Sequence, residues 1–287
     1  MALDMSSIGR PAPVAEVAWD SRDAMLYAIG VGAGQQDPGK ELQFTTENSE
    51  DFVQCVLPTY AVVIMQNAGN RPFFGDIDRS KSVHAEQGFE LFRPLPVNGK
   101  VRVTNQVVAI EDKGSGALIR FHGEAFDVET DELLMTSTSA SFVRDAGGFD
   151  PGRKSVPVQP MPETEPDVVV EAETRQDQAL LYRLSGDRNP LHSDPSFAKR
   201  GGFPRPILHG MCTYGVTGRL LLNAFCDGDP SRVRSMSARF TRPVMPGDTL
   251  KVLGWHDSDG VRFRTLNGKG EPVMDYGSLK FATESRS

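Results

Sequence analysis

The chain has 287 residues, of which 39% are hydrophobic and 24% are charged, and its formal net charge is −7. This composition suits a globular protein with one large or two modest cores, and it excludes disordered, collagen-like and disulfide-scaffold classes. No apolar run approaches the roughly 20 residues that a membrane-spanning helix needs. The excess of acidic residues disfavours nucleic acid as a partner, because the phosphate backbone carries the same sign of charge.

The N-terminus and the cysteines bear on the compartment. The first 20 residues contain neither a basic segment nor an apolar core of the kind found in secretory signals. Cys55, Cys212 and Cys226 are an odd and sparse set without a CxxC pair, as expected for reduced thiols in an intracellular protein. We therefore expect a cytoplasmic protein.

Taken in chain order, the predicted elements occur twice. An early helix with a tyrosine (Tyr27, then Tyr182) is followed by a loop, a short apolar helix and a run of about four antiparallel strands separated by Gly-rich turns. Between the two sets, residues 145–167 are rich in Pro, Gly and charge, which predicts a linker. Two degenerate copies of one unit, 1–150 and 151–287, explain this order economically.

The apolar helix of the second copy is the most informative element. The sequence ILHGMCTYGVTGRLLLNAF, which starts at Ile207, is apolar or small almost all the way round, so it predicts a helix buried on most sides. Gly210, Gly215 and Gly218 would permit close approach of strands or of a ligand. In the first copy a shorter counterpart starts at Leu57. We expect an α+β fold with an antiparallel sheet wrapped around one helix in each half, a tandem or double hot-dog.

The densest group of unusual residues is YRLSGDRNPLHSDP, which begins at Tyr182. Its Gly, Asn and Pro residues end the helix near Gly186 and predict a loop. Asp187, Asn189 and His192 could converge there, and together they supply an acceptor, an amide and a group that titrates near neutral pH, a set suited to proton transfer. The alternative is a purely structural turn, since Asp, Asn and Pro form turns by themselves.

The segment that follows the loop is locally basic. From Pro195 through Cys226 there is no Asp or Glu, whereas Lys199, Arg200, Arg205 and Arg219 occur. A polyanionic ligand is the functional interpretation of this pattern, and a solvated basic face is the structural one.

The start of the second apolar helix offers another group. Pro206 is suited to the first helical position, which would leave free N–H groups in the first turn. The amide of Gly210 could then stabilise a developing oxyanion, although Gly210 could equally serve helix–sheet packing. For His209 we expect a satisfied buried or capping role rather than a catalytic one.

Other kinds of site fit the sequence less well. Asp187, His192 and Asp194 have no His or Cys partner at ligand spacing, so we expect no metal site. Gly30, Gly32 and Gly34 follow a helix-like segment and lack a P-loop Lys, so a nucleotide site is not expected. No GxSxG elbow of the kind found in serine hydrolases is present.

These residues carry a resemblance to a known family. The run YRLSGDRNPLHSDPSFAKRGGFPRPILHGMCTYG closely resembles the signature of MaoC-like, R-specific 2-enoyl-CoA hydratases (hydratase 2), including the hydratase domain of peroxisomal multifunctional enzymes. The resemblance implies a double hot-dog that hydrates trans-2-enoyl-CoA reversibly to (3R)-3-hydroxyacyl-CoA without metal or redox cofactor. It makes Asp187 and His192 the catalytic pair, Asn189 part of the water-positioning network and the Gly210 amide an oxyanion donor.

The first copy departs from this pattern. Gly32 stands where the second copy has Asp187, and no His follows within the required few residues. We therefore expect one active site per chain, with the N-terminal unit (1–150) providing a cavity for the acyl chain. The resemblance implies an acyl-CoA thioester as substrate, from fatty-acid or bulky acyl-chain metabolism in which steroid side chains are one candidate. Lys199, Arg200 and Arg205 are candidates for binding CoA. A homodimer is compatible with this interpretation.

Three alternatives stay open from the sequence. A (3R)-hydroxyacyl thioester dehydratase could act in the opposite direction or on an acyl-carrier protein. A hot-dog thioesterase would use the same scaffold for another reaction, and a non-catalytic acyl-CoA-binding subunit would use no reaction at all. The intact second loop, with Asp187, Asn189 and His192, favours hydration over the last two.

Overall fold

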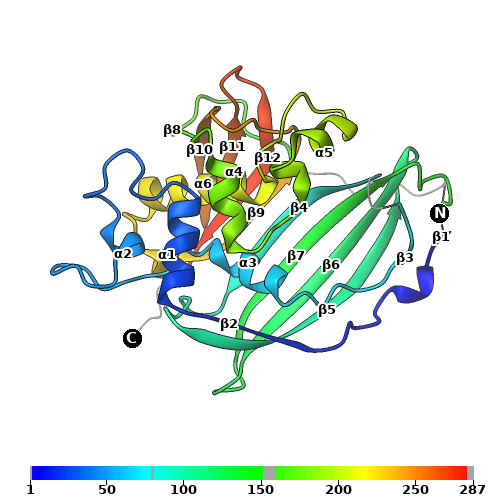
Figure 1. The fold of residues 1–287 in the computed structure, drawn as a ribbon, viewed down its shortest axis with the longest axis horizontal. Coiled ribbons are helices and arrows are strands. Elements are labelled where there is room, and N and C mark those ends of the chain that lie inside the picture. Colours follow the sequence, from blue (N-terminus) through cyan, green and yellow to red (C-terminus); the bar gives the residue numbers. More distant parts are fainter. Residues whose placement is uncertain (1, 79–80, 151–158, 283–287) are drawn as a thin grey trace.

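The computed structural model describes residues 2–78, 81–150 and 159–282. One large antiparallel sheet of ten strands dominates this part of the chain, in the order β2-β5-β6-β7-β4-β9-β12-β11-β10-β8 (Figure 1). The first five strands in this order are β2 (Ala15–Trp19), β5 (Gly99–Asp112), β6 (Gly116–Asp127), β7 (Leu133–Arg144) and β4 (Ser82–Leu91). The other five are β9 (Val233–Phe240), β12 (Pro272–Phe281), β11 (Gly260–Leu266), β10 (Thr249–Asp257) and β8 (Val168–Glu173).

The strand order has an internal symmetry. Each half contributes an edge strand, three strands joined as a meander, and one strand at the junction, where β4 pairs with β9 in the register Gln87↔Ala238. The predicted double hot-dog is confirmed, but with five strands per half in this sheet instead of about four. The edge strands β2 and β8 are the ones that sequence reasoning missed, because segments of 5 and 6 residues show little periodicity. The boundary at 150/151 stays a prediction, since residues 151–158 lie outside the described residues.

Helices occupy the concave side of each half. The first half contains α1 (Ser21–Gly30), α2 (Leu42–Thr45) and α3 (Tyr60–Asn67), and the second contains α4 (Gln178–Tyr182), α5 (Pro195–Arg200) and α6 (Gly210–Phe225). Short 3₁₀ turns, η1 (Met5–Ser7), η3 (Arg183–Ser185), η4 (Pro190–His192) and η5 (Pro230–Arg232), and a two-stranded sheet of β1 (Ala2–Leu3) and β3 (Gly75–Asp76) complete the described elements.

Local sequence explains where the early helix begins. Asp20 is the N-cap of α1: its side chain accepts a hydrogen bond from the Asp23 amide at 3.0 Å, and the Asp23 side chain accepts one from the Asp20 amide at 3.2 Å. This reciprocal capping satisfies two N–H groups that the first turn would otherwise leave free. In Figure 1, α1 lies beside α4, its counterpart in the second half.

The second apolar helix begins later than expected. Helix α6 starts at Gly210, so the prediction that Pro206 takes the first helical position is wrong. The preceding groups are held by tertiary partners instead: the Leu208 amide donates to the Val244 carbonyl at 2.8 Å, and the Ile207 carbonyl is bonded to His192 at 2.9 Å. These bonds keep the segment extended up to the start of the helix.

The two halves share one hydrophobic core. Tyr27, Tyr182 and Tyr214, each at most 1% exposed, belong to the same buried cluster. A Cβ on Gly215 would lie 2.6 Å from the Tyr27 hydroxyl, so this glycine lets α6 approach α1 closely. The close approach expected for this position is therefore made by a helix of the first half.

No helix among the described residues is long and apolar enough to cross a membrane.

Candidate active site

The loop between α4 and α5 carries the predicted catalytic residues. Gly186 follows η3 with φ of +141°, a conformation that side chains disfavour, and it redirects the chain as the sequence predicted. The Asp187 carboxylate then accepts a hydrogen bond from the Asn189 amide at 3.0 Å. The Asn189 side chain accepts one from the Leu191 amide at 3.0 Å and so caps η4, which ends at His192. The turn chemistry of the loop thus sets the spacing of Asp187 and His192.

His192 is fixed within the plane of its ring. Only 9% of its surface is exposed, and its Nδ1 lies 2.9 Å from the Ile207 carbonyl oxygen. Because a carbonyl can only accept, Nδ1 carries the proton of the neutral ring, and Nε2 is left as the acceptor. Burial lowers the pKa of His192, against smaller opposite effects of the Ile207 carbonyl and the Asp187 carboxylate. His192 is therefore a neutral base near pH 7.

A second histidine joins the pair. One ligand-type atom from each of Asp187, His192 and His209 lies within 4.8 Å of the other two. The rings of His192 and His209 are stacked, with centroids 3.8 Å apart and planes inclined by 29°. Rings stacked in this way do not direct their in-plane lone pairs at one ion, so the cluster fits proton transfer better than metal binding.

His209 differs from the expectation of a satisfied histidine. It is the N-cap residue of α6, but its side chain makes no capping hydrogen bond. Its Nε2 lies 3.2 Å from the Asp187 carbonyl oxygen, and its Nδ1 is buried without a partner. Burial and then the neighbouring His192 lower the pKa of His209 to about 4. Two more buried side-chain atoms without a partner among the described residues, Arg183 Nε and Ser185 Oγ, lie at η3, just before the same loop.

Gly210 is the first residue of α6. The N–H groups of a first helical turn have no partner in their own helix, and they carry the positive end of its dipole. A Cβ on Gly210 would lie 3.4 Å from the Phe240 ring, an ordinary contact, so packing alone does not require glycine here. The position suits the predicted oxyanion donor, because a free backbone amide is available beside the Asp187 loop.

Two residues of the first half reach this site, and sequence reasoning missed both. Asn67, the last residue of α3, donates from Nδ2 to the Ser185 carbonyl at 2.9 Å. The centroid of the His84 ring lies 4.9 Å from that of the Phe240 ring. His84 is next to a β-bulge, because one extra residue stands between His84 and Glu86 in the pairing of β4 with β7. Such bulges often redirect a side chain next to an active site. Desolvation lowers the pKa of His84, against opposite effects of the Glu86 carbonyl, the Gln87 side chain and, least, the Asp187 carboxylate. Nothing in the local sequence indicates either contact.

The basic residues of the second half are dispersed. Lys199 and Arg200 are exposed at the end of α5, whose following Gly201 packs near Leu191 of the catalytic loop. The Arg205 guanidinium donates to the Pro246 carbonyl at 3.0 Å. Arg219 is only 8% exposed, so it is a structural residue and not part of a basic surface.

Arg219 instead marks the place where a second site would lie. Its Nε donates to the Val31 carbonyl at 3.0 Å, and its Nη1 contacts both Glu41 carboxylate oxygens at 2.9 and 2.8 Å. A Cβ on Gly32, the counterpart of Asp187, would lie 3.3 Å from Nη2 of Arg219. At the place in the first half that corresponds to the Asp187 loop, an ion pair between Glu41 and Arg219 of the second half therefore stands instead of the acid and the imidazoles.

Comparisons with known proteins identify the family of the chain. Residues 18–145 match the family model described as the MFE-2 hydratase 2 N-terminal domain, and residues 157–274 match the MaoC like domain. The chain is 43% identical over 291 residues to 3-hydroxyacyl-thioester dehydratase Y of Mycobacterium tuberculosis, covering 98% of this chain and 99% of that protein.

A second relative and a solved structure point to the same family. The chain is 37% identical over 271 residues to the peroxisomal enoyl-CoA hydratase 2 of Arabidopsis thaliana, covering 88% of this chain and 87% of the relative. A crystal structure of a MaoC-like dehydratase from Phytophthora capsici is similar with a TM-score of 0.87 at 30% identity, over 99% of both chains. The chain therefore belongs to the MaoC-like hydratase 2 family.

Proposed function

We propose that this enzyme, a hydro-lyase, hydrates trans-2-enoyl-CoA reversibly to (3R)-3-hydroxyacyl-CoA at one site per chain, with Asp187 and His192 as the catalytic pair. The observation that carries the proposal is the convergence of the Asp187 carboxylate and the unprotonated Nε2 of His192 beside the free first-turn amide of Gly210. These are the three groups that addition of water to a conjugated thioester requires.

The chemistry follows from these groups. A water between Asp187 and His192 gives its hydroxide to Cβ of the enoyl group, and the proton held by the pair returns to Cα on the same face. Negative charge that develops on the thioester oxygen is stabilised by the Gly210 amide and the positive end of the α6 dipole. The Asn189 side-chain oxygen accepts a hydrogen bond from the Leu191 amide. The Nδ2 group of Asn189 is therefore left to orient the water. We assign the acid and base roles to Asp187 and His192 as a pair.

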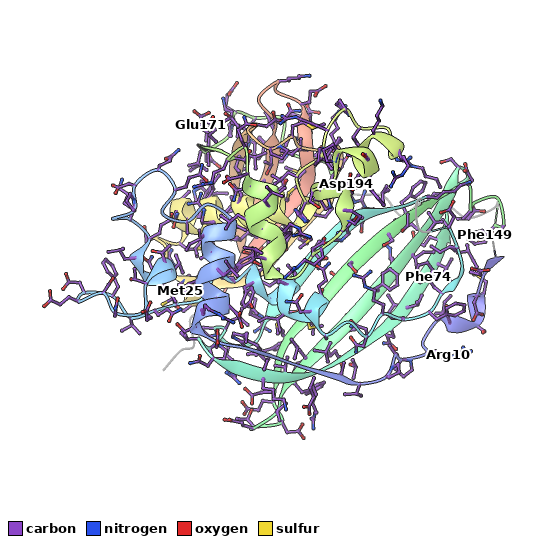
Figure 2. The ribbon with its side chains drawn as sticks, in the orientation of Figure 1. Arg10, Met25, Phe74, Phe149, Glu171 and Asp194 are labelled. Carbon is purple, nitrogen blue, oxygen red and sulfur yellow. The ribbon has the colours of Figure 1, made fainter. Side chains whose placement is uncertain are left out.

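The acyl tail extends into the first half in this proposal. Helix α3 has 8 residues and α6 has 16, lengths of about 12 and 24 Å. The sheet beyond α3 is instead covered by chain segments such as that of Phe74, which lies over the long strands and packs against Phe121 of β6 with ring centroids 5.4 Å apart (Figure 2). A cover of loop residues leaves more freedom for an apolar ligand than a continuous helix does.

For CoA we propose Lys199, Arg200 and Arg205. The first two stand at the end of α5, which packs beside the catalytic loop, and both are exposed. Charged groups at that place suit the phosphates of CoA. Arg205 already donates to the Pro246 carbonyl, so it supplies fewer free donors than the other two.

The alternative activity, a dehydratase, catalyses the same reaction in reverse. It stays a second candidate because the Mycobacterium tuberculosis relative is named a 3-hydroxyacyl-thioester dehydratase. A carrier-protein thioester would present the same reacting atoms to Asp187 and His192. We propose the CoA thioester and the hydration direction for this chain, in fatty-acid or bulky acyl-chain metabolism. The three free cysteines support a cytoplasmic location. For the assembly we propose a homodimer, which light scattering tests.

One experiment tests the proposed reaction. Purified enzyme is mixed with crotonyl-CoA and longer enoyl-CoAs while enoyl absorbance and free thiol are followed together. We expect loss of absorbance without release of thiol, and a product of (3R) configuration. Thiol release at the rate of substrate loss would identify a thioesterase, and no change in either signal would leave a binding subunit. The same assay with an enoyl-acyl-carrier protein decides between the two carriers.

A further inference from the structure

His209 connects the three groups of the proposed reaction. Its ring stacks on that of His192 with centroids 3.8 Å apart, and its Nε2 lies 3.2 Å from the Asp187 carbonyl oxygen. Its main-chain carbonyl accepts from the amides of Cys212 and Thr213 at 3.0 and 3.1 Å, so the same residue starts the helix whose first amide belongs to Gly210. Only 1% of its surface is exposed.

The hydrogen-bonding pattern of His209 is not the one that stability alone would favour. The Asp187 carbonyl can only accept, so Nε2 carries the ring proton and Nδ1 is a bare acceptor. Nδ1 is buried and has no partner, and a buried polar atom without a partner destabilises the fold. A phenylalanine would fill the same space without this cost. Buried polar atoms that lack partners in native proteins usually have a reason outside packing.

The two contacts of His209 restrain different parts of the site, the ring of His192 and the main chain of Asp187. The Ile207 carbonyl fixes the His192 ring in its own plane, and the His209 ring restrains it from above that plane. The bond to the Asp187 carbonyl restrains the main chain that carries the carboxylate. A misplacement of about 1 Å in a reacting group can cost on the order of 100-fold in rate.

We propose that His209 is a positioning residue for hydration: it holds the His192 ring and the Asp187 main chain in fixed relation to the Gly210 amide. The proposal rests on the catalytic pair proposed above. It assigns no contact with substrate to His209, and it explains why a polar ring occupies a buried position at the start of α6.

Two substitutions separate the contacts. His209→Gln keeps an N–H donor within reach of the Asp187 carbonyl and removes the stacked ring. His209→Phe keeps a ring against His192 and removes the donor. We expect each to lower kcat with crotonyl-CoA by about 10- to 100-fold and to change KM by less than about threefold, because the residues proposed for CoA are untouched.

The matched control is Cys212→Ala. Cys212 is fully buried three residues further along the same helix, so its substitution tests a general loss of packing. We expect its kcat per folded molecule, with folding checked by circular dichroism, to equal that of the wild type. A loss of kcat in only one His209 variant would support the proposal and identify the contact that matters. If one variant does not fold, the other decides.

The proposal is overturned if the folded His209 variants keep kcat within about twofold of the wild type, or lose no more than Cys212→Ala does. Asp187→Asn and His192→Ala are measured in the same assay. If these two are inactive while the His209 variants are fully active, only the positioning role is wrong. If all four are active, the catalytic pair itself is wrong.

Discussion

The two halves of this molecule share a scaffold and differ in one loop. Each has an early helix with a buried tyrosine, an apolar helix and five strands of the common sheet. Five residues after the tyrosine, the second half places Asp187 next to two imidazoles, whereas the first half places Gly32 against the Arg219 guanidinium. A catalytic site can thus be absent from one copy without disturbing the sheet, because the loop is not part of the strand pairing.

The halves nevertheless depend on each other. The last residue of α3 binds the Ser185 carbonyl, and Arg219 of α6 binds the Val31 carbonyl, so each apolar helix holds the loop of the other half. A Cβ on Gly186 would lie 2.0 Å from Oδ1 of Asn67, so any other residue there would displace the Asn67 side chain from its bond to the loop. The first half therefore helps to shape the active site of the second.

The largest expected difference between the halves is catalytic. We expect Asp187→Asn and His192→Ala each to lower the hydration rate by about 10²- to 10⁴-fold, the usual contribution of a positioned acid or base. Steady-state kinetics on enoyl-CoA measure this. The matched change in the first half is Asp37→Ala, five residues after Gly32 as His192 is five residues after Asp187. Asp37 is exposed, and we expect no change in rate.

If folded Asp187→Asn or His192→Ala kept a kcat near that of the wild type, the assignment of these two residues as the catalytic pair would be wrong. A loss in Asp37→Ala comparable to that of His192→Ala would instead mean that the first half is catalytic too.

The ion pair between Glu41 of the first half and Arg219 of the second should contribute to stability rather than to rate. Arg219→Met leaves the Glu41 carboxylate, whose side chain is 14% exposed, without its cation. Removing one partner of a buried pair costs about 3 kcal/mol. Urea unfolding should show this loss, whereas kcat per folded molecule should stay within about threefold of the wild type. Unfolding at the wild-type urea concentration would show that the pair does not hold the halves together.

The same pair predicts a pH dependence. Burial acts to raise the pKa of Glu41, but Arg219, Asn223 and the Gly34 amide together lower it below the ordinary value of 4.5. A carboxyl with a lowered folded pKa adds stability above 4.5, and this stability is lost as the pH falls through the folded value. In Glu41→Gln we expect the free energy of unfolding to fall less steeply than in the wild type below pH 4.5. Parallel curves in acid would contradict the assignment.

A smaller effect should separate the two halves by substrate length. Ala68 is the C-cap residue of α3, so it stands where this helix ends after 8 residues, whereas α6, its counterpart in the second half, has 16. We expect Ala68→Phe to lower kcat/KM for long or bulky enoyl-CoAs by about tenfold and to spare a four-carbon substrate, since only the tail reaches that far. Activity across a series of chain lengths measures this, and the four-carbon substrate is the internal control. A larger residue at Ala61 would not serve this test, because Ala61 is fully buried in the core.

Binding stoichiometry gives an independent check of the same division. A tight, unreactive acyl-CoA analogue should saturate at one equivalent per chain in calorimetry. A uniform loss of activity across chain lengths in Ala68→Phe, or a stoichiometry of two, would mean that the first half does not accommodate the tail.

The smallest expected effect concerns the charge of the two loops. The segment that follows Gly32, from 33 to 59, contains five acidic residues and one lysine, whereas Pro195 through Cys226 contains no acid. Neutralising Lys199, Arg200 and Arg205 together should raise KM several-fold with little change in kcat, because contacts with CoA phosphates are equal in ground and transition states. The rise should be larger at low salt, where charges are screened less. An unchanged KM would exclude these residues from CoA binding.

Contiguous sequence was enough for much of this description. The turn residues from Gly186 to His192 predict the loop because they act on their own backbone, and the 3.6-residue and two-residue patterns predict the helices and the meanders. The edge strands were missed because their segments are short, and the start of α6 was placed at Pro206 because its competing partners, Val244 and His192, lie elsewhere in the chain.

The sequence by itself therefore determined the two copies, the family and the residues with catalytic potential. Only the tertiary structure decided which of these residues meet and what surrounds them. Arg219 and Glu41 are 178 positions apart. His192 and His209 stack on each other, and Asn67 of the other half donates to the Ser185 carbonyl just before the loop that carries His192. The physical reason is range. Turns and helices follow from interactions between near neighbours, whereas burial, ring stacking and ion pairing depend on which distant segments the folded sheet brings together.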